Sequence, residues 1–376
     1  MSVYLDCNAT TPMDSAVQST ILRFMAEEFG NSGSRTHEYG NRAKVAVQKA
    51  RDQVAEAIGA DRNEVIFTSG ATESNNLAIL GLAPFGERSG RRHIISTEIE
   101  HKAVLEPLEN LQRLGFDVTL VAPEPGGYVN PDTLRLALRP DTLLVSVMHV
   151  NNETGVMQPL DEICSLLVDH PAYLHVDAAQ GFGKATAQLR NRRIDLIGLT
   201  AHKIYGPKGV GALIARRRGF DRPPLAPLMF GGGQEHGMRP GTLPVPLIVG
   251  FGLAAELADK GAGRWHEKCL AYRSQMLRGL ASLNPELNGD QGRVLPNTVS
   301  LSIPGLDSEA FMLATKGLIA VSNGSACTSQ SYQPSHVLIA MGLGRDRVSS
   351  TVRLSWCHLT PPTDWDEVVA ALKRVL

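Results

Sequence analysis

The stretch that decides the fold is YLHVDAAQGFGKATAQLRNRRIDLIGLTAHKIYG, residues 173–206. It contains two short runs rich in apolar residues, 173–177 and 194–199. Five further runs of this kind occur along the chain, at residues 64–68, 93–97, 117–121, 142–148 and 210–215. Most of them are continuously apolar rather than alternating, which is typical of strands that are covered on both faces of a sheet. We therefore expect all seven to be strands.

Segments with helical periodicity lie between several of these runs. In one of them, Val47, Ala50, Val54 and Ile58 fall on one face of a helix, and Gly59 can close that helix. Alternation of strands and helices predicts an α/β fold with a mostly parallel central sheet.

The second half of the chain follows a different pattern. Residues 222–241 contain prolines and the run GGG, so we expect a long functional loop there. From about Trp265 the pattern predicts a long amphipathic helix, followed by short strands at 297–303 and 352–355. These elements predict a second, smaller domain.

Composition excludes several classes of protein. The 376 residues carry a formal net charge of -1, which gives no electrostatic argument for binding to nucleic acid or to an anionic membrane. The five cysteines are scattered without a CxxC pair, so we expect neither a disulfide framework nor a metal site. The N-terminus lacks the pattern of a signal peptide, and no stretch approaches the roughly 20 apolar residues that span a bilayer. We expect a cytoplasmic protein.

Three polar signals follow predicted strands. Asp177 ends the strand at 173–177, Lys203 follows the strand at 194–199, and the turn Ser69-Gly70-Ala71-Thr72 follows the strand at 64–68 and opens a helix. Polar groups at the carboxyl ends of strands lie where α/β sheets bind ligands, and free amides at a helix start favour a phosphate. A lysine that is desolvated there becomes nucleophilic.

Each signal alone has an ordinary structural explanation. Asp177 is about equally well explained as a helix cap, a lone lysine is usually solvated, and any strand-helix turn can resemble residues 69–72. The GPKG sequence after Lys203 lacks the spacing of a P-loop, and no GxGxxG follows the first strands. Together, however, a phosphate site, a carboxylate and an amine predict a site for pyridoxal 5'-phosphate.

Cys327 differs from the other cysteines in its surroundings. It lies in SNGSACTSQS, residues 322–331, whose small polar residues predict an exposed and mobile loop. Such a loop is a poor setting for a structural thiol, so we interpret Cys327 as reactive. For Cys164, Cys269 and Cys357 we expect buried structural thiols.

Taken together, the motifs resemble the cysteine desulfurases, which are fold-type I pyridoxal-phosphate enzymes of the class V aminotransferase group. The resemblance covers almost the whole chain and is carried by motifs that include YLDCNATTP, IFTSGATESNNLA, SVMHVNNETGV, LHVDAAQ, AHKIYGPKGVGAL, GGGQEHGMRPGTLP and GSACTS. It implies a mostly parallel sheet with helices on both faces and a smaller α/β domain. The implied domains are residues 12–255, which bind the cofactor, and residues 1–11 with 256–376, which carry the Cys327 loop.

The resemblance also implies roles for residues around the cofactor ring. Lys203 would hold the cofactor covalently and move the substrate's Cα proton, and Asp177 would pair with the pyridine nitrogen. His101 would stack on the ring and exchange protons with the substrate thiol, although a histidine at such a turn is otherwise usually a surface residue. Gln180 would donate to the phenolate oxygen of the ring, and Asn152 would lie at the edge of cofactor and substrate.

Further residues are implied to hold the phosphate and the substrate. Ala71, Thr72, Thr200 and His202 would surround the phosphate, and Thr242 would reach the phosphate of a second subunit, which implies a homodimer. For the substrate carboxylate, the resemblance implies a bidentate contact from Arg353 with help from Asn31.

The implied activity converts L-cysteine to L-alanine and leaves a persulfide on Cys327 for an acceptor protein. The stretches near residues 37–39, 82–94 and 238–248 look closer to the desulfurases of DNA phosphorothioation systems, and a sulfur donor for iron-sulfur clusters or for tRNA thiolation is the alternative. Another class V aminotransferase or lyase would share Lys203 and Asp177 without needing Cys327. A binding or regulatory protein on the same fold would form no covalent link to the cofactor.

Overall fold

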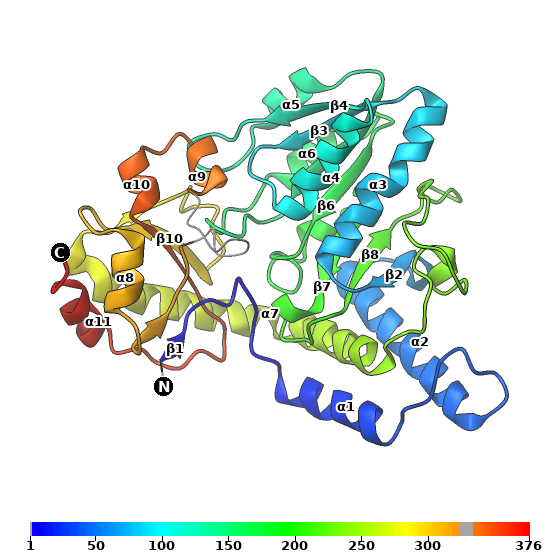
Figure 1. Cartoon of the computed structure of the whole chain (residues 1–376), viewed down its shortest axis with the longest axis horizontal. Coiled ribbons are helices and arrows are strands. Elements are labelled where there is room, and N and C mark those ends of the chain that lie inside the picture. The colour runs from blue at the N-terminus through cyan, green and yellow to red at the C-terminus, as the bar shows by residue number, and fades with distance from the viewer. Residues whose placement is uncertain (1, 324–333) are drawn as a thin grey trace.

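The structure is a computed structural model that describes residues 2–323 and 334–376. Its large part is built on a seven-stranded sheet with the order β2-β8-β7-β6-β5-β3-β4 (Figure 1). The strands are β2 (Val65–Thr68), β3 (His93–Thr97), β4 (Asp117–Val121), β5 (Thr142–Met148), β6 (Tyr173–Asp177), β7 (Leu196–Thr200) and β8 (Gly211–Ala215). All seven predicted strands are confirmed to within two residues. Only β8 runs antiparallel to its neighbours, β2 and β7, so the sheet is mostly parallel as predicted.

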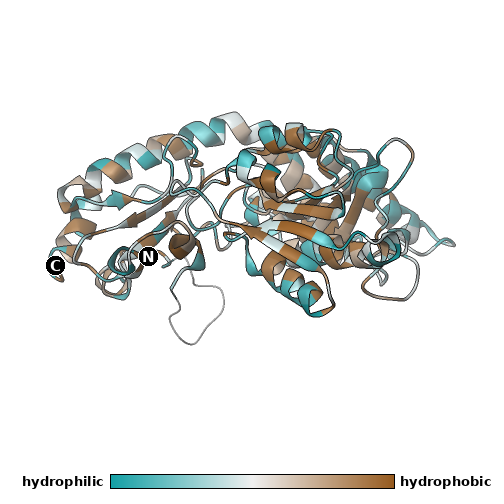
Figure 2. Cartoon of the chain, turned by 90° about the horizontal axis from the view of Figure 1, so that it is seen from above, coloured by the Kyte–Doolittle hydropathy of each residue, from teal (hydrophilic) through white to brown (hydrophobic). Residues whose placement is uncertain are grey.

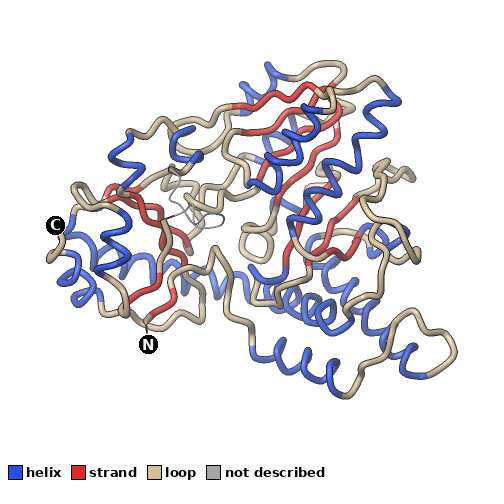
Figure 3. Tube along the Cα trace, viewed as in Figure 1, coloured by secondary structure: helices blue, strands red, loops and turns tan. Residues whose placement is uncertain are grey.

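Helices cover both faces of this sheet (Figure 3). They are α1 (Ser15–Ala26), α2 (Glu38–Ile58), α3 (Ala71–Ser89), α4 (Lys102–Arg113), α5 (Pro131–Ala137), α6 (Leu160–Leu166) and α7 (Val245–Leu280). Short 3-10 turns occur at Arg62–Glu64, Gln188–Arg190, Ala201–Lys203, Glu235–Gly237 and Ala281–Leu283. The predicted helix over residues 47–58 is the second half of α2, and Gly59 closes it in the left-handed conformation.

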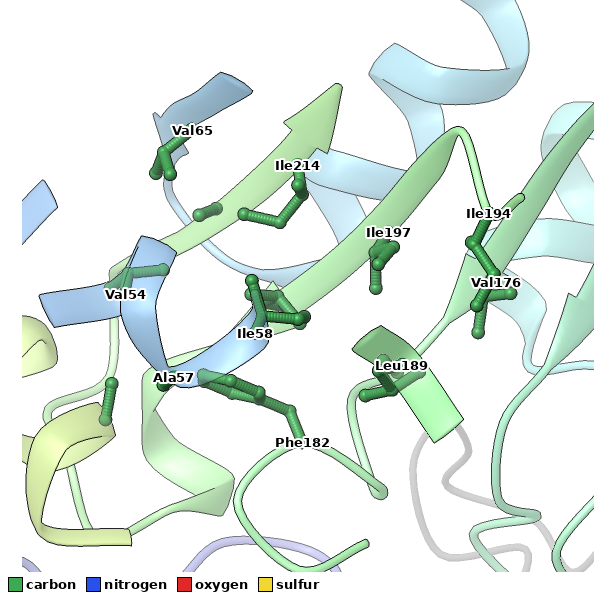
Figure 4. Packing of buried hydrophobic residues seen from close by; sticks show 14 of the residues in the cluster. Val54, Ala57, Ile58, Val65, Val176, Phe182, Leu189, Ile194, Ile197 and Ile214 are labelled. Carbon is green, nitrogen blue, oxygen red and sulfur yellow. The ribbon is translucent and has the colours of Figure 1, made fainter. Parts of the chain in front are cut away.

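Alternate side chains of each strand pack into two separate hydrophobic cores, because successive residues of a strand point to opposite faces of the sheet. Val65, Ile197 and Ile214 pack against Val54 and Ile58 of α2 (Figure 4). On the other face, the core contains Ile66 and Leu213 of the sheet together with apolar residues of α3 and α4. Figure 2 shows the strands as largely apolar, as expected of a sheet between two helical layers.

The smaller part contains two further sheets. One is antiparallel with the order β12-β10-β9, from β9 (Glu286–Leu287), β10 (Thr298–Ser302) and β12 (Thr351–Ser355), and the other pairs β1 (Val3–Tyr4) with β11 (Ile319–Ala320). The helices of this part are α8 (Ser308–Ala314), α9 (His336–Ala340), α10 (Arg345–Ser349) and α11 (Trp365–Leu372). The strands predicted at 297–303 and 352–355 are confirmed.

Helix α7 begins earlier than the sequence pattern predicts. It starts at Val245 rather than near Trp265 and runs for 36 residues from the large part to the small one (Figure 1). Its first half carries glycines that mask the helical pattern, but Gly252 is needed because a Cβ there would lie 2.5 Å from the Ala50 Cα of α2. The domain boundary that we predict at 255/256 falls inside this continuous helix and stays a prediction.

The irregular segment predicted at 222–241 is confirmed, since it contains only the 3-10 turn at Glu235–Gly237 between β8 and α7. Within the described residues, no helix is both long enough and apolar enough to cross a membrane.

Candidate active site

The three predicted polar signals lie at one edge of the large sheet. Strands β6 and β7 are parallel neighbours, so Asp177 and the turn that carries Lys203 leave the sheet at the same edge. Strand β8 joins β7 to β2, and Gly211 pairs with both Thr200 and Thr68. The helix start after β2 therefore also lies at this edge.

Lys203 and Gln180 converge on one backbone carbonyl. The Nζ of Lys203 donates to the carbonyl of Asn8 and, at 2.8 Å, to that of Ala9, while Nε2 of Gln180 donates to the Asn8 carbonyl at 2.9 Å. The N-terminal segment is fixed there because Thr11 donates to the His202 carbonyl at 3.0 Å. The chain start thus lies across the lysine turn.

Asp177 is buried and oriented by two donors. Its Oδ2 accepts from Nδ2 of Asn75 at 2.8 Å, and its Oδ1 accepts from the backbone amide of Ala179 at 2.9 Å. These two contacts occupy one lone pair on each oxygen, so the carboxylate can still accept from a further donor.

The turn before α3 presents a glycine and the start of a helix at this edge. Gly70 precedes the helix with φ +157° and ψ -177°, a region that only glycine adopts readily. The free amides at the start of the helix include those of Ala71 and Thr72. Thr200 is buried, with its Oγ1 3.7 Å from a Cβ built on Gly70. Burial and the neighbouring Lys203 lower the pKa of His202 to about 4, which keeps its ring neutral near neutral pH.

Arg353 and Asn152 meet on the small-domain side. Arg353 of β12 is 2% exposed; it donates to the Asn152 carbonyl at 2.9 Å and to Oδ1 of Asp6 at 2.7 Å. Its Nε is buried and has no hydrogen-bond partner in the described part of the chain. A ligand carboxylate would satisfy this unpaired donor. The Asn8 side chain also donates to the Asn152 carbonyl, at 3.1 Å. Since Lys203 donates to the backbone carbonyl of the same Asn8, Arg353 and Asn152 lie near Lys203.

His101 caps helix α4, because its Nδ1 accepts from the amide of Ala103 at 3.0 Å. It directly follows Glu100, whose Oε1 accepts from the Met148 amide at 2.8 Å. The Oε2 of Glu100 is buried without a hydrogen-bond partner in the described residues, and burial raises the pKa of this carboxyl to about 8.

Two predicted site residues that the structure describes, Asn31 and Thr242, are not brought into this group. Asn31 is exposed between α1 and α2, where its side chain accepts from the Gly33 amide at 2.8 Å. Thr242 is exposed ahead of α7. Cys327 lies outside the described residues. Cys164, Cys269 and Cys357 are buried, as predicted.

Sequence reasoning missed four residues that contact or adjoin the site: Asn8, Asn75, Glu100 and Lys184. Lys184 donates to Oε1 of Gln180 at 3.3 Å, and burial lowers its pKa to about 8. Asn75 had a detectable signal, because it shares helical spacing with the buried residues Ala78, Ile79 and Leu82. A polar residue on such a face is buried and therefore needs a partner.

The residues at this edge fit pyridoxal phosphate. They supply a buried carboxylate for the ring nitrogen, an amide donor at Gln180 for the ring oxygen, a lysine amine for the aldehyde, and helix-start amides for the phosphate.

Comparison with known proteins supports this assignment. Residues 3–368 match the family model of aminotransferase class-V. The chain is 45% identical over 369 residues to the cysteine desulfurase IscS of Anaeromyxobacter sp. (strain Fw109-5), covering 98% of this chain and 90% of that protein. The crystal structure of DndA from Streptomyces lividans is 52% identical with a TM-score of 0.83, covering 93% of this chain and 98% of that one. A structure of SspA in complex with cysteine is 36% identical with a TM-score of 0.81, covering 96% and 100%.

Proposed function

Because this chain belongs to the aminotransferase class-V family and is a pyridoxal-phosphate-dependent cysteine desulfurase, we propose that it stores sulfur as a persulfide on Cys327 and supplies DNA phosphorothioation. The observation that supports the catalytic part is the convergence of Lys203, Gln180 and Arg353 on the backbone of Asn8 and Asn152, beside the buried Asp177.

We assign the cofactor contacts as the resemblance implies. When bound, pyridoxal phosphate supplies an electron sink that acidifies the Cα proton of an amino acid and weakens its carbon-sulfur bond. Asp177 would pair with the pyridine nitrogen, and Gln180 would donate to the ring oxygen. Lys203 would hold the cofactor through its amine and would move the Cα proton of the substrate. His101 would lie against the ring.

The remaining residues are assigned to binding of the phosphate and of the substrate. Amides of Ala71 and Thr72, with Thr200 and neutral His202, bind the phosphate. For L-cysteine, Arg353 presents its unpaired Nε to the carboxylate, and Asn152 and Asn31 complete the substrate site.

Sulfur transfer is a nucleophilic displacement at the substrate sulfur. His101 exchanges protons with the substrate thiol. A neighbouring base takes the proton of the Cys327 thiol, because only a small fraction of a free thiol is ionised at neutral pH. The Cys327 thiolate attacks sulfur, a sulfur-sulfur bond forms, and the bonding electrons of the carbon-sulfur bond stay with the carbon skeleton. That carbon takes up protons and leaves as L-alanine, and the persulfide passes to an acceptor protein.

We propose a homodimer in which Thr242 reaches the phosphate site of the second copy. Exposed aromatic side chains support such an interface, since Phe220 is 96% and Phe230 is 89% exposed in the segment that leads to Thr242.

The phosphorothioation pathway is supported by the stretches near residues 37–39, 82–94 and 238–248 and by the 52% identity to DndA. The 45% identity to an IscS protein supports the alternative, a sulfur donor for iron-sulfur clusters or tRNA thiolation.

The first test measures alanine released from L-cysteine in the presence of a reductant. Wild type and Cys164→Ala, which removes a buried thiol of α6, are expected to release alanine at similar rates, and Cys327→Ala is expected to release almost none. Equal release by Cys327→Ala would remove Cys327 from the mechanism. Radiolabelled persulfide protein, offered to candidate acceptors, would then identify the pathway by the acceptor that takes up the label.

A further inference from the structure

A chain of four buried polar side chains ends on Asp177. Oγ of Ser146 lies 2.8 Å from Nδ1 of His175, and Nε2 of His175 lies 3.1 Å from Oδ1 of Asn75. Nδ2 of Asn75 then donates to Oδ2 of Asp177 at 2.8 Å. Ser146, His175 and Asn75 are fully buried and Asp177 is 6% exposed, so these contacts form without competition from solvent.

The carboxylate fixes the direction of every hydrogen bond in the chain. An ionised Asp177 can only accept, so Asn75 must present its amide nitrogen to it and its oxygen to His175. Nε2 of His175 must then carry the proton, which leaves Nδ1 as an acceptor for the Ser146 hydroxyl. Burial lowers the pKa of His175 to about 3, in agreement with this neutral, singly protonated ring.

The surrounding backbone keeps space for this arrangement. The hydrogen-bonded side chains come from three elements: Ser146 from β5, His175 and Asp177 from β6, and Asn75 from α3. Position 198 of β7 is a glycine, and a Cβ there would overlap Oδ1 of Asn75. Glycine in a strand interior weakens the strand, so its presence here fits a close approach by another side chain.

We propose that Asn75 and His175 are positioning residues that hold Asp177 as an oriented proton acceptor for the pyridine nitrogen of the cofactor. The Asn75 donor and the Ala179 amide fix the rotation of the carboxylate. The carboxylate then keeps a lone pair available to the site, where it would accept a hydrogen bond from a protonated pyridine nitrogen. His175 acts through Asn75, because its N–H prevents the amide from turning its oxygen toward Asp177. This inference rests on the proposed role of Asp177.

The experiment compares His175→Leu, which breaks the chain, with His175→Gln, whose amide can accept from Ser146 and donate to Asn75. A matched control is His93→Leu, which removes another fully buried histidine held by two hydroxyls, at 2.8 Å from Thr142 and 3.0 Å from Thr119. Each protein is loaded with pyridoxal phosphate labelled with ¹⁵N in the ring. The measurements are the ¹⁵N chemical shift and the dissociation constant of the cofactor.

The wild type is expected to show a protonated pyridine nitrogen. In His175→Leu we expect the shift to move toward the unprotonated position, and the dissociation constant to rise about tenfold, the equivalent of one hydrogen bond to a charged group. His175→Gln should restore both values, and His93→Leu should keep the wild-type shift. An unchanged shift in His175→Leu would overturn the proposal, as would an equal change in His93→Leu.

Two further variants separate the possible failures. If His175→Leu does not fold, Asn75→Asp keeps the side-chain shape but replaces the donor to Asp177 by a second acceptor, and the same change in shift is expected. If Asp177→Asn leaves the shift unchanged, the proposed role of Asp177 fails. If Asp177→Asn alters the shift but neither His175→Leu nor Asn75→Asp does, Asp177 acts without the chain.

Discussion

Burial sets the charge of several single residues around Asp177. His175 and His202 have pKa values lowered to about 3 and about 4, so both rings are neutral at physiological pH. Glu100 responds in the opposite direction, because burial disfavours its charged form and raises its pKa to about 8. Each such residue links the stability of the protein to pH.

Replacing Glu100 by Gln should flatten the decline of stability with rising pH. Folded Glu100 keeps its proton up to about pH 8, whereas the unfolded chain loses it near the usual value of 4.5. Folding therefore takes up a proton between these values, and the free energy of unfolding falls as pH rises from about 5 to about 8. Because Gln does not titrate, Glu100→Gln should gain a few kcal/mol relative to wild type across this window. Urea unfolding at pH 5.5 and pH 8 measures the free energy of unfolding of both proteins. An equal decline in wild type and Glu100→Gln would contradict the raised pKa of Glu100.

Arg353→Lys should weaken the binding of L-cysteine. Arg353 already donates to Asn152 and Asp6 and retains an unpaired Nε, which only a planar guanidinium can offer in this arrangement. We expect the KM for L-cysteine to rise about ten- to hundredfold, with a smaller change in kcat, from the loss of a bidentate contact. Steady-state kinetics of alanine release test this. Arg347→Lys is the control, since Arg347 binds Asn288 and Leu287 instead, and an unchanged KM in Arg353→Lys would exclude the carboxylate role.

At the scale of elements, the large sheet could be predicted because its strands are buried on both faces and therefore apolar. The direction of β8 could not be predicted, because an apolar run has the same composition in either orientation. The start of α7 was missed for a different reason. Gly250, Gly252 and Gly261 lower helix propensity, but tertiary packing against neighbouring side chains and the α2 backbone favours them there.

Some residues of the candidate site could be predicted from their local sequence, and others depend on contacts between distant parts of the chain. The placement of Asp177 and Lys203 at one edge was predictable, because Asp177 ends one strand and Lys203 comes shortly after the next strand of a mostly parallel sheet. The burial of Asn75 could be detected from its helical spacing, but its contact with Asp177 could not, and neither could the contact of Asn8 with Lys203, since both join residues about 100 or more positions apart in sequence. The pairing of Arg353 with Asp6 likewise joins the two ends of the chain.

A buried ion pair between Glu235 and Arg51 links the segment between β8 and α7 to helix α2. The carboxylate of Glu235 accepts hydrogen bonds from the guanidinium of Arg51 in α2 at 2.6 and 2.9 Å, and from the backbone amide of Phe67 at 2.7 Å. Both charged side chains are almost fully buried from solvent. Glu235→Gln would leave Arg51 buried without a counter-charge. The free energy of unfolding should fall by about 3–5 kcal/mol.

Urea unfolding also provides the control for this prediction. Combining Arg51→Met with Glu235→Gln removes the uncompensated charge, so the double variant should be more stable than Glu235→Gln alone. Additive losses would show that the two side chains do not act as a pair.

On the scale of the whole molecule, the site lies where the two parts meet, and three aromatic rings lie at this junction. Trp265 of α7 stacks on His358 of the small part, with centroids 4.0 Å apart and planes within 2°. Tyr205 meets both rings edge-on, at 5.0 Å and 4.6 Å. Tyr205 follows Lys203 by two residues and has a positive φ of 67°, a strained conformation for a bulky residue. We expect these ring contacts to keep Tyr205 in this conformation and thereby to help position Lys203.

Trp265→Ala should therefore affect both stability and cofactor binding. Removing a partly buried indole and two ring contacts should lower the free energy of unfolding by about 2–4 kcal/mol. Without the rings against it, Tyr205 can leave its strained conformation and displace Lys203, so the dissociation constant of pyridoxal phosphate should rise severalfold. Trp265→Phe keeps a ring in the stack and should lose less of both. Unfolding in urea and equilibrium dialysis of the cofactor separate the two effects. A destabilised Trp265→Ala protein with unchanged cofactor affinity would mean that the lysine turn is held by the N-terminal segment at Thr11 and not by the junction.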